Sequence, residues 1–431
     1  MKILFITDNF VPEVNAPATR TYEHCREWVE WGTEITVITC VPNFPQGKVY
    51  KGYKNKLFQV EYIDGIKVIR VWSYIAANKG FIKRILDYLS FSFMAFITGL
   101  FQKADIIIAT SPQFFTTWSA YGLSLIKRKP WIFELRDLWP ESIKTVGVMK
   151  ENSLYKSLER IELFLYRKAN LVIPNTDAFK ANLTIRGINA DKIQVVPNGA
   201  NLELFYPRAP QAKLLERLKT GNKLLIGYIG THGMAHNLDF ILKSALKLQD
   251  IDKELHFLFI GDGAQKKNLL KMADENNIKN VTFLDPIPKE KIPDYLSVID
   301  ISLVPLKKAE TFTKVIPSKI FESAAMSKPI LLGVEGQAEK IIKKYNAGLC
   351  FEPENEQDFI DNLLNFKRNR ILMKDYGKNG LSLAKDYDRK ILAQQMLHLI
   401  YEVVNKSSIK PVIIFKEPHK KKAKGTSVIA D

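Results

Sequence analysis

The sequence predicts an α/β protein made of two doubly wound, Rossmann-like domains that face each other across a cleft. Short apolar runs alternate with helical stretches, which is typical of parallel βαβ units. The alternation restarts after Val195–Gly199, and a length of 431 residues suits two or three domains. Because ligands of such sheets lie beyond the carboxyl ends of the strands, we expect the functional residues in the loops that follow them.

Each predicted strand is a short apolar run bounded by polar or turn residues. In the first half the strands are Ile3–Thr7, Ile35–Thr39, Lys67–Val71, Ile106–Thr110, Trp131–Leu135 and Leu171–Pro174. In the second half they are Leu224–Ile229, His256–Ile260, Val281–Leu284, Ile301–Pro305 and Ile330–Gly333.

Apolar residues at helical spacing near the C-terminus predict a last helix that packs back across the first domain. These residues are Leu392, Met396, Leu399, Ile400 and Val403.

We therefore divide the chain into a first domain (1–198), a second domain (199–386), the returning helix (387–405) and a Lys-rich tail (406–431). The composition of the tail indicates mostly disorder. Its apolar island, Val412–Phe415, could form an edge strand or a membrane contact.

Cysteine usage and the N-terminus predict a cytoplasmic protein. Cys25, Cys40 and Cys350 lie far apart with no metal-ligand spacing, which favours a reducing compartment over a disulfide framework. The apolar run at the N-terminus ends at Asp8 and is too short for a signal peptide, so we interpret it as a buried first strand.

The formal net charge of +17 indicates an anionic partner or surface. No helix-turn-helix, aromatic RNA-binding signature or zinc module is present, so we expect no nucleic acid. An anionic membrane leaflet is the favoured partner. Lysines that serve only solubility are the alternative.

The segment Phe81–Lys103 is unusually apolar, with no charge from Tyr88 to Phe101. It is too short for a bilayer span, which needs about 20 residues. It is either a buried helix of the first domain or an aromatic-rich helix lying in a membrane interface, with cations at its ends. These cations are Lys79, Lys83, Arg84 and Lys103.

The stretch from Pro317 to Ile330 predicts a tight turn, one short helix and the next strand. The backbone N–H of Ser318 and the positive end of the helix dipole suit an anion, and Lys319 adds a charge. About one turn along, Glu322 offers two acceptor oxygens for vicinal sugar hydroxyls. The pattern favours a nucleotide-sugar site. An ordinary helix–strand connection with a solvated Lys and Glu is the alternative.

Three motifs carry a resemblance to a known family. They are Asp-Asn-Phe-x-Pro-Glu (Asp8–Glu13), Arg-Asp-Leu-Trp-Pro-Glu-Ser (Arg136–Ser142) and Pro-Ser-Lys-x-Phe-Glu (Pro317–Glu322). With the Val196–Gly199 junction, the chain resembles GT-B-fold glycosyltransferases of retaining family 4. Within that family it is similar to the WbuB-type O-antigen and capsule enzymes, which transfer N-acetylated deoxyamino sugars. The resemblance runs from Met1 to about Asn405.

The resemblance implies how the second domain binds the nucleotide sugar. The second of the family's paired glutamates binds the ribose, and it corresponds to Glu322. Lys314 stands where the family has the first glutamate, so we expect it near phosphate. The Arg and Lys that clamp the diphosphate in the family are absent here, so Lys319 supplies that charge, with Ser318 beside it.

The loop in which the family carries that Arg and Lys reads Gly230-Thr231-His232-Gly233-Met234-Ala235-His236. Gly230 and Thr231 are implied donor contacts. His232 or His236 would add hydrogen bonds, although neither is reliably charged at neutral pH.

Other donor contacts are implied by the glycine turn at Gly261 and Gly263 and by Ile287, near the segment whose backbone reads the base in the family. Asp250–Asp252 and Asp386–Asp388 match Asp-x-Asp by letter only, because one joins a helix to a strand and the other precedes the last helix. We expect neither a metal nor a cofactor.

In the first domain, Asn15 and Ala16 stand where the family has a glycine pair, and they are still small enough to let the donor approach. The family's His-Asp motif aligns with Arg136 and Asp137. Arg136 suits phosphate or acceptor contact, and Asp137 is the carboxylate expected near the acceptor hydroxyl. A helix N-cap with an adjacent ion pair is the alternative interpretation of these two residues.

The resemblance implies a metal-independent retaining hexosyltransferase that uses a UDP-sugar. Its work is to stabilise diphosphate charge and to fix geometry, which needs no nucleophile-and-base pair. The implied acceptor is a polyprenyl-diphosphate-linked glycan at the inner face of the cytoplasmic membrane, in O-antigen or capsule synthesis. A UDP-sugar 2-epimerase and a non-catalytic nucleotide-sugar-binding protein of the same fold are the rival hypotheses.

Overall fold

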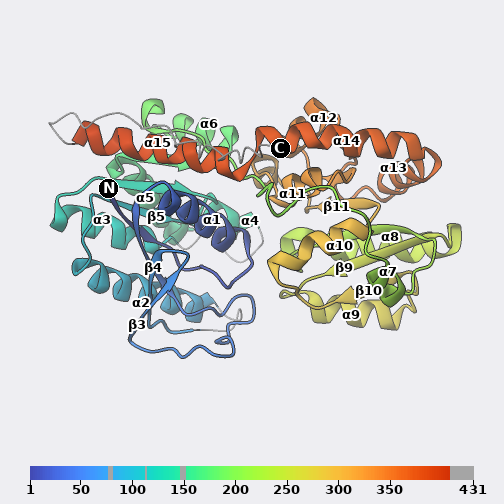
Figure 1. Ribbon diagram of the computed structural model, residues 1–431, viewed down its shortest axis with the longest axis horizontal. Helices are drawn as coiled ribbons and strands as arrows, with labels where there is room; N and C mark the ends of the chain where they lie inside the picture. Colours follow the sequence, from blue (N-terminus) through green and yellow to red (C-terminus); the bar gives the residue numbers. More distant parts are fainter. Residues whose placement is uncertain (76–80, 112–113, 146–151, 408–431) are drawn as a thin grey trace, which may run out of the picture.

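The computed structural model describes residues 1–75, 81–111, 114–145 and 152–407, which form two α/β domains side by side (Figure 1). The first domain has a seven-stranded sheet of order β3-β4-β2-β1-β5-β6-β7, and the second a six-stranded sheet of order β10-β9-β8-β11-β12-β13. In both, the strand order reverses beside a central strand, which is the doubly wound topology. The predicted fold class is confirmed.

The sheet of the first domain is parallel except for β3, which pairs antiparallel with β4. Its strands are β1 (Lys2–Ile6), β2 (Glu34–Cys40), β3 (Phe58–Ile63), β4 (Ile66–Val71), β5 (Ile106–Thr110), β6 (Trp131–Leu135) and β7 (Leu171–Pro174). Its helices are α1 (Ala16–Glu30), α2 (Phe81–Leu100), α3 (Thr116–Lys127), α4 (Glu141–Thr145), α5 (Ser153–Lys168) and α6 (Asp177–Ile185).

The sheet of the second domain is parallel throughout. Its strands are β8 (Leu224–Ile229), β9 (Leu255–Ile260), β10 (Val281–Leu284), β11 (Ile301–Pro305), β12 (Ile330–Gly333) and β13 (Gly348–Cys350). Its helices are α7 (Ala212–Leu218), α8 (Leu238–Ile251), α9 (Lys266–Glu275), α10 (Ile292–Val298), α11 (Lys319–Ala325), α12 (Gln337–Tyr345), α13 (Glu356–Arg368) and α14 (Arg370–Asp386).

The last helix, α15 (Arg389–Ser407), runs back along the first domain, as the sequence predicts (Figure 1). Its buried face includes Leu392, Met396 and Ile400. The indole N–H of Trp28, on α1, donates a 2.8 Å hydrogen bond to the Ala393 carbonyl. Apolar burial and this bond fix α15 against α1.

The chain crosses between the domains at two adjoining points. The Ala200 N–H donates to the Tyr387 carbonyl at 3.1 Å, and the Arg389 N–H donates to the Ala200 carbonyl at 2.8 Å. A Cβ at Gly199 would lie 2.0 Å from the Tyr387 oxygen, so only glycine fits at this crossing. The predicted boundaries after residues 198 and 386 adjoin it, and their exact positions stay predictions. Val412–Phe415 and most of the predicted tail lie outside the described residues.

Candidate functional site

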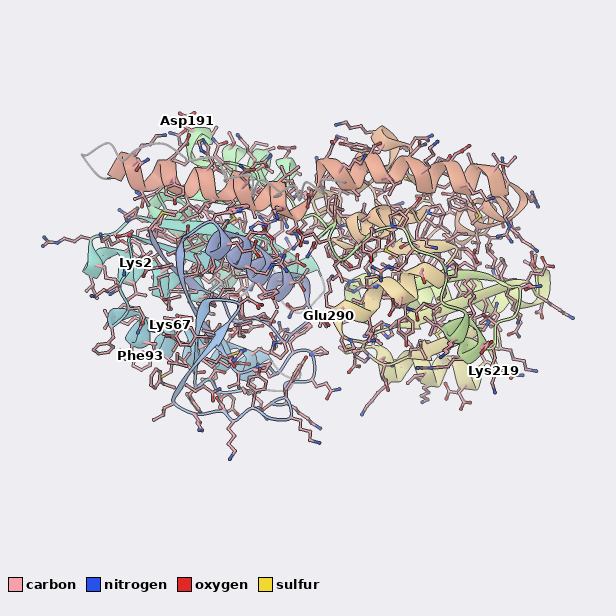
Figure 2. All side chains as sticks on the ribbon, viewed as in Figure 1. Lys2, Lys67, Phe93, Asp191, Lys219 and Glu290 are labelled. Atoms are coloured by element: carbon pink, nitrogen blue, oxygen red, sulfur yellow. The ribbon has the colours of Figure 1, made fainter. Side chains whose placement is uncertain are left out.

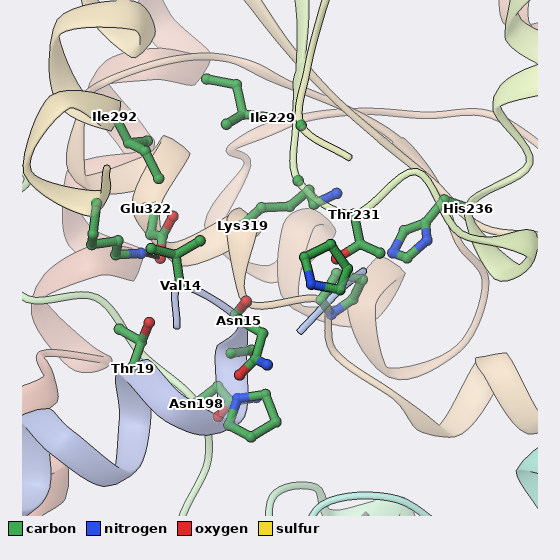
Figure 3. Close-up of a pocket in the computed structure, with 18 of the residues that line it drawn as sticks. Val14, Asn15, Thr19, Asn198, Ile229, Thr231, His236, Ile292, Lys319 and Glu322 are labelled. Carbon is green, nitrogen blue, oxygen red and sulfur yellow. Dashed lines mark hydrogen bonds and ion pairs between the residues drawn. The ribbon is translucent and has the colours of Figure 1, made fainter. Parts of the chain in front are cut away.

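A cleft of about 450 Å³ opens between the carboxyl edges of the two sheets. Both domains line it, with Asn15, Thr19 and Asn198 on one side and Thr231, Lys319 and Glu322 on the other (Figure 3). The predicted residues that line the cleft are Asn15, Ala16, Arg136, Asp137, Gly230, Thr231, Gly261, Ile287, Ser318, Lys319 and Glu322. Their individual roles remain predictions.

Two predicted side chains reach the cleft from the short helix α11. The sequence Pro317 to Gly333 folds into the expected turn, helix and strand β12, with Ser318 at the N-cap position. Ile320, Phe321 and Ala324 are buried in the core of the second domain. Because 3.6 residues make one turn, Lys319 and Glu322 share the face that lines the cleft.

Lys319 is a cation without a protein counter-charge in contact. Its Nζ lies 3.7 Å from the centroid of the Tyr228 ring. Among the described residues, this Nζ makes no hydrogen bond, and no carboxylate oxygen lies within 4 Å of it. Burial lowers the pKa of Lys319 to about 7, against the opposing effect of Glu322. At pH 7 this amino group is therefore about half protonated, and an anion beside it would favour the charged form.

Glu322 already has a partner within the protein. Its carboxylate forms an ion pair with Lys289, and both side chains are only 15% exposed. The Lys289 Nζ also lies 4.8 Å from the centroid of the Phe205 ring. Lys289, in the 3₁₀ turn Lys289–Lys291, was not predicted from the sequence. In the sequence, Lys289 could have been suggested only by its position two residues after Ile287, in the segment expected to contact the nucleotide base.

The loop after β8 divides between the cleft and the core. Gly230, Thr231 and His236 line the cleft. His232 does not, because its fully buried ring packs beside Tyr228 and Phe283. Burial lowers the pKa of His232 to about 4 and that of His236 to about 3. Both rings are therefore neutral near pH 7, and His236, rather than His232, is positioned to contact a ligand.

The glycine turn after β9 supports this loop. A Cβ at Gly261, where φ is 142°, would lie 1.9 Å from the Gly230 oxygen. Glycine therefore lets the loops after β8 and β9 meet at the cleft. Gly263 packs against the His232 backbone and is not among the residues that line the cleft. Between them, the Asp262 carboxylate accepts a 2.9 Å bond from Gln46 Nε2 of the first domain.

Lys314 lies outside the cleft lining, in contrast to the expected position near phosphate. Its Nζ pairs with Glu141 of the first domain at 2.8 Å and with Glu310 at 3.5 Å. The Lys314 carbonyl accepts a 2.8 Å hydrogen bond from Thr176 Oγ1. Because these carboxylates already neutralise it, Lys314 acts here as a tie between the domains.

The wall formed by the first domain begins at α1. Asn15 is the N-cap of α1, where its side-chain oxygen accepts from the Ala18 N–H at 2.9 Å. Arg136 Nη2 donates to the Ala16 carbonyl at 3.1 Å, and its Nη1 lies 3.8 Å from Glu134. Burial lowers the pKa of Arg136 to about 9, so it stays charged at neutral pH. The backbone contact fixes the guanidinium at the edge of the cleft.

Asp137 lines the cleft beside Arg136 but is not its ion-pair partner. Burial raises the pKa of Asp137, while a hydrogen bond from Ser142 opposes that shift. This carboxylate is therefore bonded to Ser142 in the first turn of α4, and no N-cap bond from Asp137 is found among the described residues. The ion pair of Arg136 is with Glu134 instead.

A buried cluster of charged side chains lies behind Arg136. Arg20 pairs with Glu134 at 2.8 Å and Arg389 pairs with Glu23 at 2.9 Å. All four side chains are nearly inaccessible. Arg389 also lines the cleft. It was not predicted as a site residue, because it lies on the returning helix, far along the sequence from the other cleft residues. With Arg136, three guanidiniums share two carboxylates, so this cluster carries net positive charge.

No three His, Cys, Asp or Glu side chains gather into a metal-binding group anywhere in the described ranges. The charged side chains that line the cleft are Arg136, Lys289, Lys319, Arg389, Asp137, Asp262 and Glu322. The arrangement suits a ligand that has one apolar part and a strongly anionic part.

Comparison with known families matches each half of the chain separately. Residues 15–199 match the glycosyl transferase 4-like domain, and residues 212–382 match the glycosyl transferases group 1 domain. Among curated proteins, a relative named as colanic acid biosynthesis glycosyl transferase WcaI of Escherichia coli K12 is 24% identical, over 92% of this chain and 97% of its own. TuaH of Bacillus subtilis 168, named for teichuronic acid biosynthesis, is 24% identical over 64% and 66%.

Solved structures share the fold across nearly the whole chain. Sucrose-phosphate synthase of Thermosynechococcus elongatus has a TM-score of 0.74 and 16% identity, over 94% of this chain and 99% of its own. HepE of Anabaena, solved in complex with UDP and glucose, has a TM-score of 0.72 and 16% identity, over 93% and 99%. The fold and the two matched domains together identify the chain as a glycosyltransferase of the GT-B fold.

Proposed function

We propose that the chain is a retaining, metal-independent glycosyltransferase that moves a sugar from a UDP-sugar to a lipid-linked glycan. The observation that carries the proposal is Lys319, a cation without a counter-charge, one helical turn from the carboxylate of Glu322 in the interdomain cleft. A diphosphate satisfies the first group and ribose hydroxyls satisfy the second.

The other cleft residues support a nucleotide donor. Ile287 and Ile292 give an apolar wall for a base near Glu322. Gly230 and Thr231 bring backbone close to Lys319, where a phosphate would lie. HepE, whose fold is similar, has been solved with UDP-glucose. These contacts favour UDP, and the small residues Asn15 and Ala16 leave room for the sugar.

The proposed step needs no covalent intermediate. The acceptor oxygen forms a bond to the anomeric carbon on the face from which the diphosphate leaves, and the anomeric C–O bond to phosphate breaks. The acceptor proton passes to a phosphate oxygen of the departing UDP. Lys319 and Arg136 stabilise the growing phosphate charge from the two domains, and Asp137 orients the acceptor hydroxyl.

The proposed acceptor is a polyprenyl-diphosphate-linked glycan in O-antigen or capsule synthesis, and the proposed sugar is an N-acetylated deoxyamino sugar. The relatives named for colanic acid and teichuronic acid synthesis support a surface polysaccharide. A net charge of +17 supports peripheral binding at the cytoplasmic face of an anionic membrane.

A panel of UDP-sugars tests the proposal. Each is mixed with the purified chain and a polyprenyl-diphosphate-linked N-acetylhexosamine, and UDP release is followed. We expect one donor to give acceptor-dependent UDP, with the anomeric configuration retained in the product by NMR. A 2-epimerase would convert a UDP-sugar without any acceptor, and a binding protein would bind UDP with no turnover. Either result would reject the proposal.

A further inference from the structure

Helix α2 is buried on one side and apolar on the other. Phe91 and Ala95 are fully buried in the core of the first domain, so the prediction of a core helix holds for that side. The exposed side carries large apolar residues three or four positions apart, which form one stripe along the helix. The stripe is Leu86, Leu89, Phe93 and Ile97, and Phe101 follows just beyond the helix. Phe93 is 63% exposed and lies on the outer side of α2 at the lower left of Figure 2.

The edge strand β3 widens the stripe. Val60 stands opposite Ile69 of β4 in the antiparallel pair, and opposed side chains share a face of the sheet. Ile69 belongs to the same core cluster as Phe91, so this is the face that α2 covers. Because β3 is the outermost strand, its side chains on this face are exposed. They are Phe58, Val60 and Tyr62.

The end of α3 continues the stripe at its other end. Lys127 Nζ donates to the carbonyls of Leu100 and Gln102 at 2.8 Å, which ties the end of α3 to the end of α2. Leu125 and Ile126 are both exposed there. The exposed apolar side chains of β3, of the outer side of α2 and of the end of α3 together form what we call the apolar face.

Cations surround the apolar face. Lys54 and Lys56 precede β3, Lys83 lies in the first turn of α2, Lys103 follows α2, and Arg128 and Lys129 follow α3, all exposed. Basic residues around an apolar patch are typical of proteins that lie on anionic lipid. Two copies of the chain meeting through this face would bring their basic rims together, which disfavours a second copy as the occupant.

The face adjoins the cleft at the start of α2. Asp87 of α2 lies close enough to Asp8 that, after burial, it is the main cause of the raised pKa of Asp8. Asn9 Nδ2 donates to Asp8 at 3.3 Å, and Asn15 Nδ2 donates to Asn9 at 2.5 Å. Asn15 lines the cleft. The start of α2, which carries one end of the apolar face, is therefore connected to the cleft wall through these side chains.

We propose that the apolar face is the docking surface for an anionic lipid bilayer, with the side chains of α2, β3 and the end of α3 inserted among the lipids. The inference specifies where the membrane of the proposed function is bound, and it rests on that function only for the acceptor. Docking itself requires no donor chemistry. Among the described residues no helix is long and apolar enough to cross a membrane, and this mode of binding does not need one.

Vesicle flotation of the full chain tests the docking surface. We expect binding to vesicles that contain phosphatidylglycerol, weak binding to phosphatidylcholine alone, and release as salt rises. The double variant Phe93→Gln, Phe101→Gln should bind roughly tenfold more weakly, since it removes two of the inserted side chains. The matched control is Ile185→Gln, Ile371→Gln, because Ile185 is 87% and Ile371 74% exposed on α6 and α14, away from the face. The control should bind as the unaltered chain does.

Two further measurements complete the test: one on variants that remove cations around the face, and one on donor binding. Lys103→Gln with Arg128→Gln should reduce the preference for anionic vesicles. UDP calorimetry should give the same affinity for every variant, so failure of the donor site and failure of docking are separate results. No flotation with any vesicle, or equal losses in the control, would overturn the proposal. So would a concentration-dependent dimer that Phe93→Gln abolishes, because it would show that a second copy covers the face.

Discussion

The two walls of the cleft treat their charges in opposite ways. In the first domain, Arg20 and Glu134 are 2.8 Å apart and Arg389 and Glu23 are 2.9 Å apart, all in near-complete burial. In the second domain, Lys319 lies over the Tyr228 ring, and among the described residues no carboxylate is within 4 Å of its Nζ. In the first wall, both buried carboxylates therefore already have a guanidinium partner within the protein. In the second wall, the charged form of Lys319 would gain an anionic partner from a bound ligand.

The difference follows from the cost of burying charge. Breaking a buried ion pair leaves an uncompensated charge and costs about 3–5 kcal/mol, so the guanidinium cluster is a rigid support. A lysine that is buried without a carboxylate partner destabilises the folded protein instead, and this cost of burying the charge lowers its pKa. An anion that binds beside Lys319 recovers this energy. We therefore expect Lys319 of the second domain to contribute more to catalytic charge stabilisation than Arg136 of the first domain does.

Removal of Lys319 tests this assignment most strongly. Charge on the leaving diphosphate grows in the transition state, so Lys319→Ala should lower kcat about a hundredfold or more, the scale of losing one oxyanion donor. Steady-state kinetics with the donor found in the panel would measure it.

The matched control is Lys314→Ala. Its Nζ is bound to Glu141 and Glu310, so the substitution should cost less turnover and act mainly through the contact between the domains. If Lys314→Ala abolished turnover while Lys319→Ala kept it, the phosphate cation would be Lys314 and the comparison of the two walls would fail.

Most of the fold could be predicted because buried parallel strands are continuous apolar runs, such as Ile106–Thr110 and Trp131–Leu135. The two strands that were missed, β3 and β13, lie at the sheet edges. In β3, half-buried and exposed positions alternate, so Phe58–Ile63 has no apolar run. β13 has only three residues, Gly348–Cys350, too few for any periodic signal.

The site was predictable where one segment holds both the motif and its geometry, as for Lys319 and Glu322 on α11. The site was not predictable where burial, or a partner far along the chain, decides whether a side chain lines the cleft. His232 and His236 are alike in sequence, yet only the second ring lines the cleft. Lys289 could not be recognised as a site residue from the sequence, because what marks it is its ion pair with Glu322, 33 positions along the chain.

Substitutions in the Glu322–Lys289 pair test whether Glu322 exchanges Lys289 for the ribose hydroxyls when the donor binds. Glu322→Ala should weaken UDP binding about tenfold or more, because ribose hydroxyls are left without an acceptor at roughly 1–3 kcal/mol. Lys289→Met keeps the carboxylate and removes its competitor. It should therefore strengthen binding of uridine, which has no phosphate, by about threefold, the scale of a modest ion pair.

Isothermal calorimetry with uridine and UDP separates these effects. Unchanged UDP affinity in Glu322→Ala would remove its ribose role. A large loss of UDP affinity, with uridine unaffected, in Lys289→Met would show that Lys289 binds phosphate, and that Lys319 is not the main cation.

The smallest expected effect is on pH dependence. With a pKa of about 7, Lys319 is about half protonated at pH 7. UDP favours the charged form and raises this pKa, so binding takes up a proton, and affinity falls as pH rises above 7. Between pH 7 and pH 8 the protonated fraction drops about fivefold, and UDP affinity should drop with it.

The ionisable rings beside Lys319 titrate outside this window, and Glu13, whose pKa burial raises to about 7, accepts a hydrogen bond from the Phe44 N–H on the opposite wall. The pKa values of His232 and His236 are lowered to about 4 and 3, and burial raises that of Tyr228 well above its usual value. Calorimetry at pH 7 in buffers of different ionisation enthalpy should count about half a proton taken up per UDP bound. Lys319→Ala should abolish both the uptake and the slope above pH 7. If the slope persisted in that variant, another group would be titrating, and the second wall would not hold its free charge at Lys319.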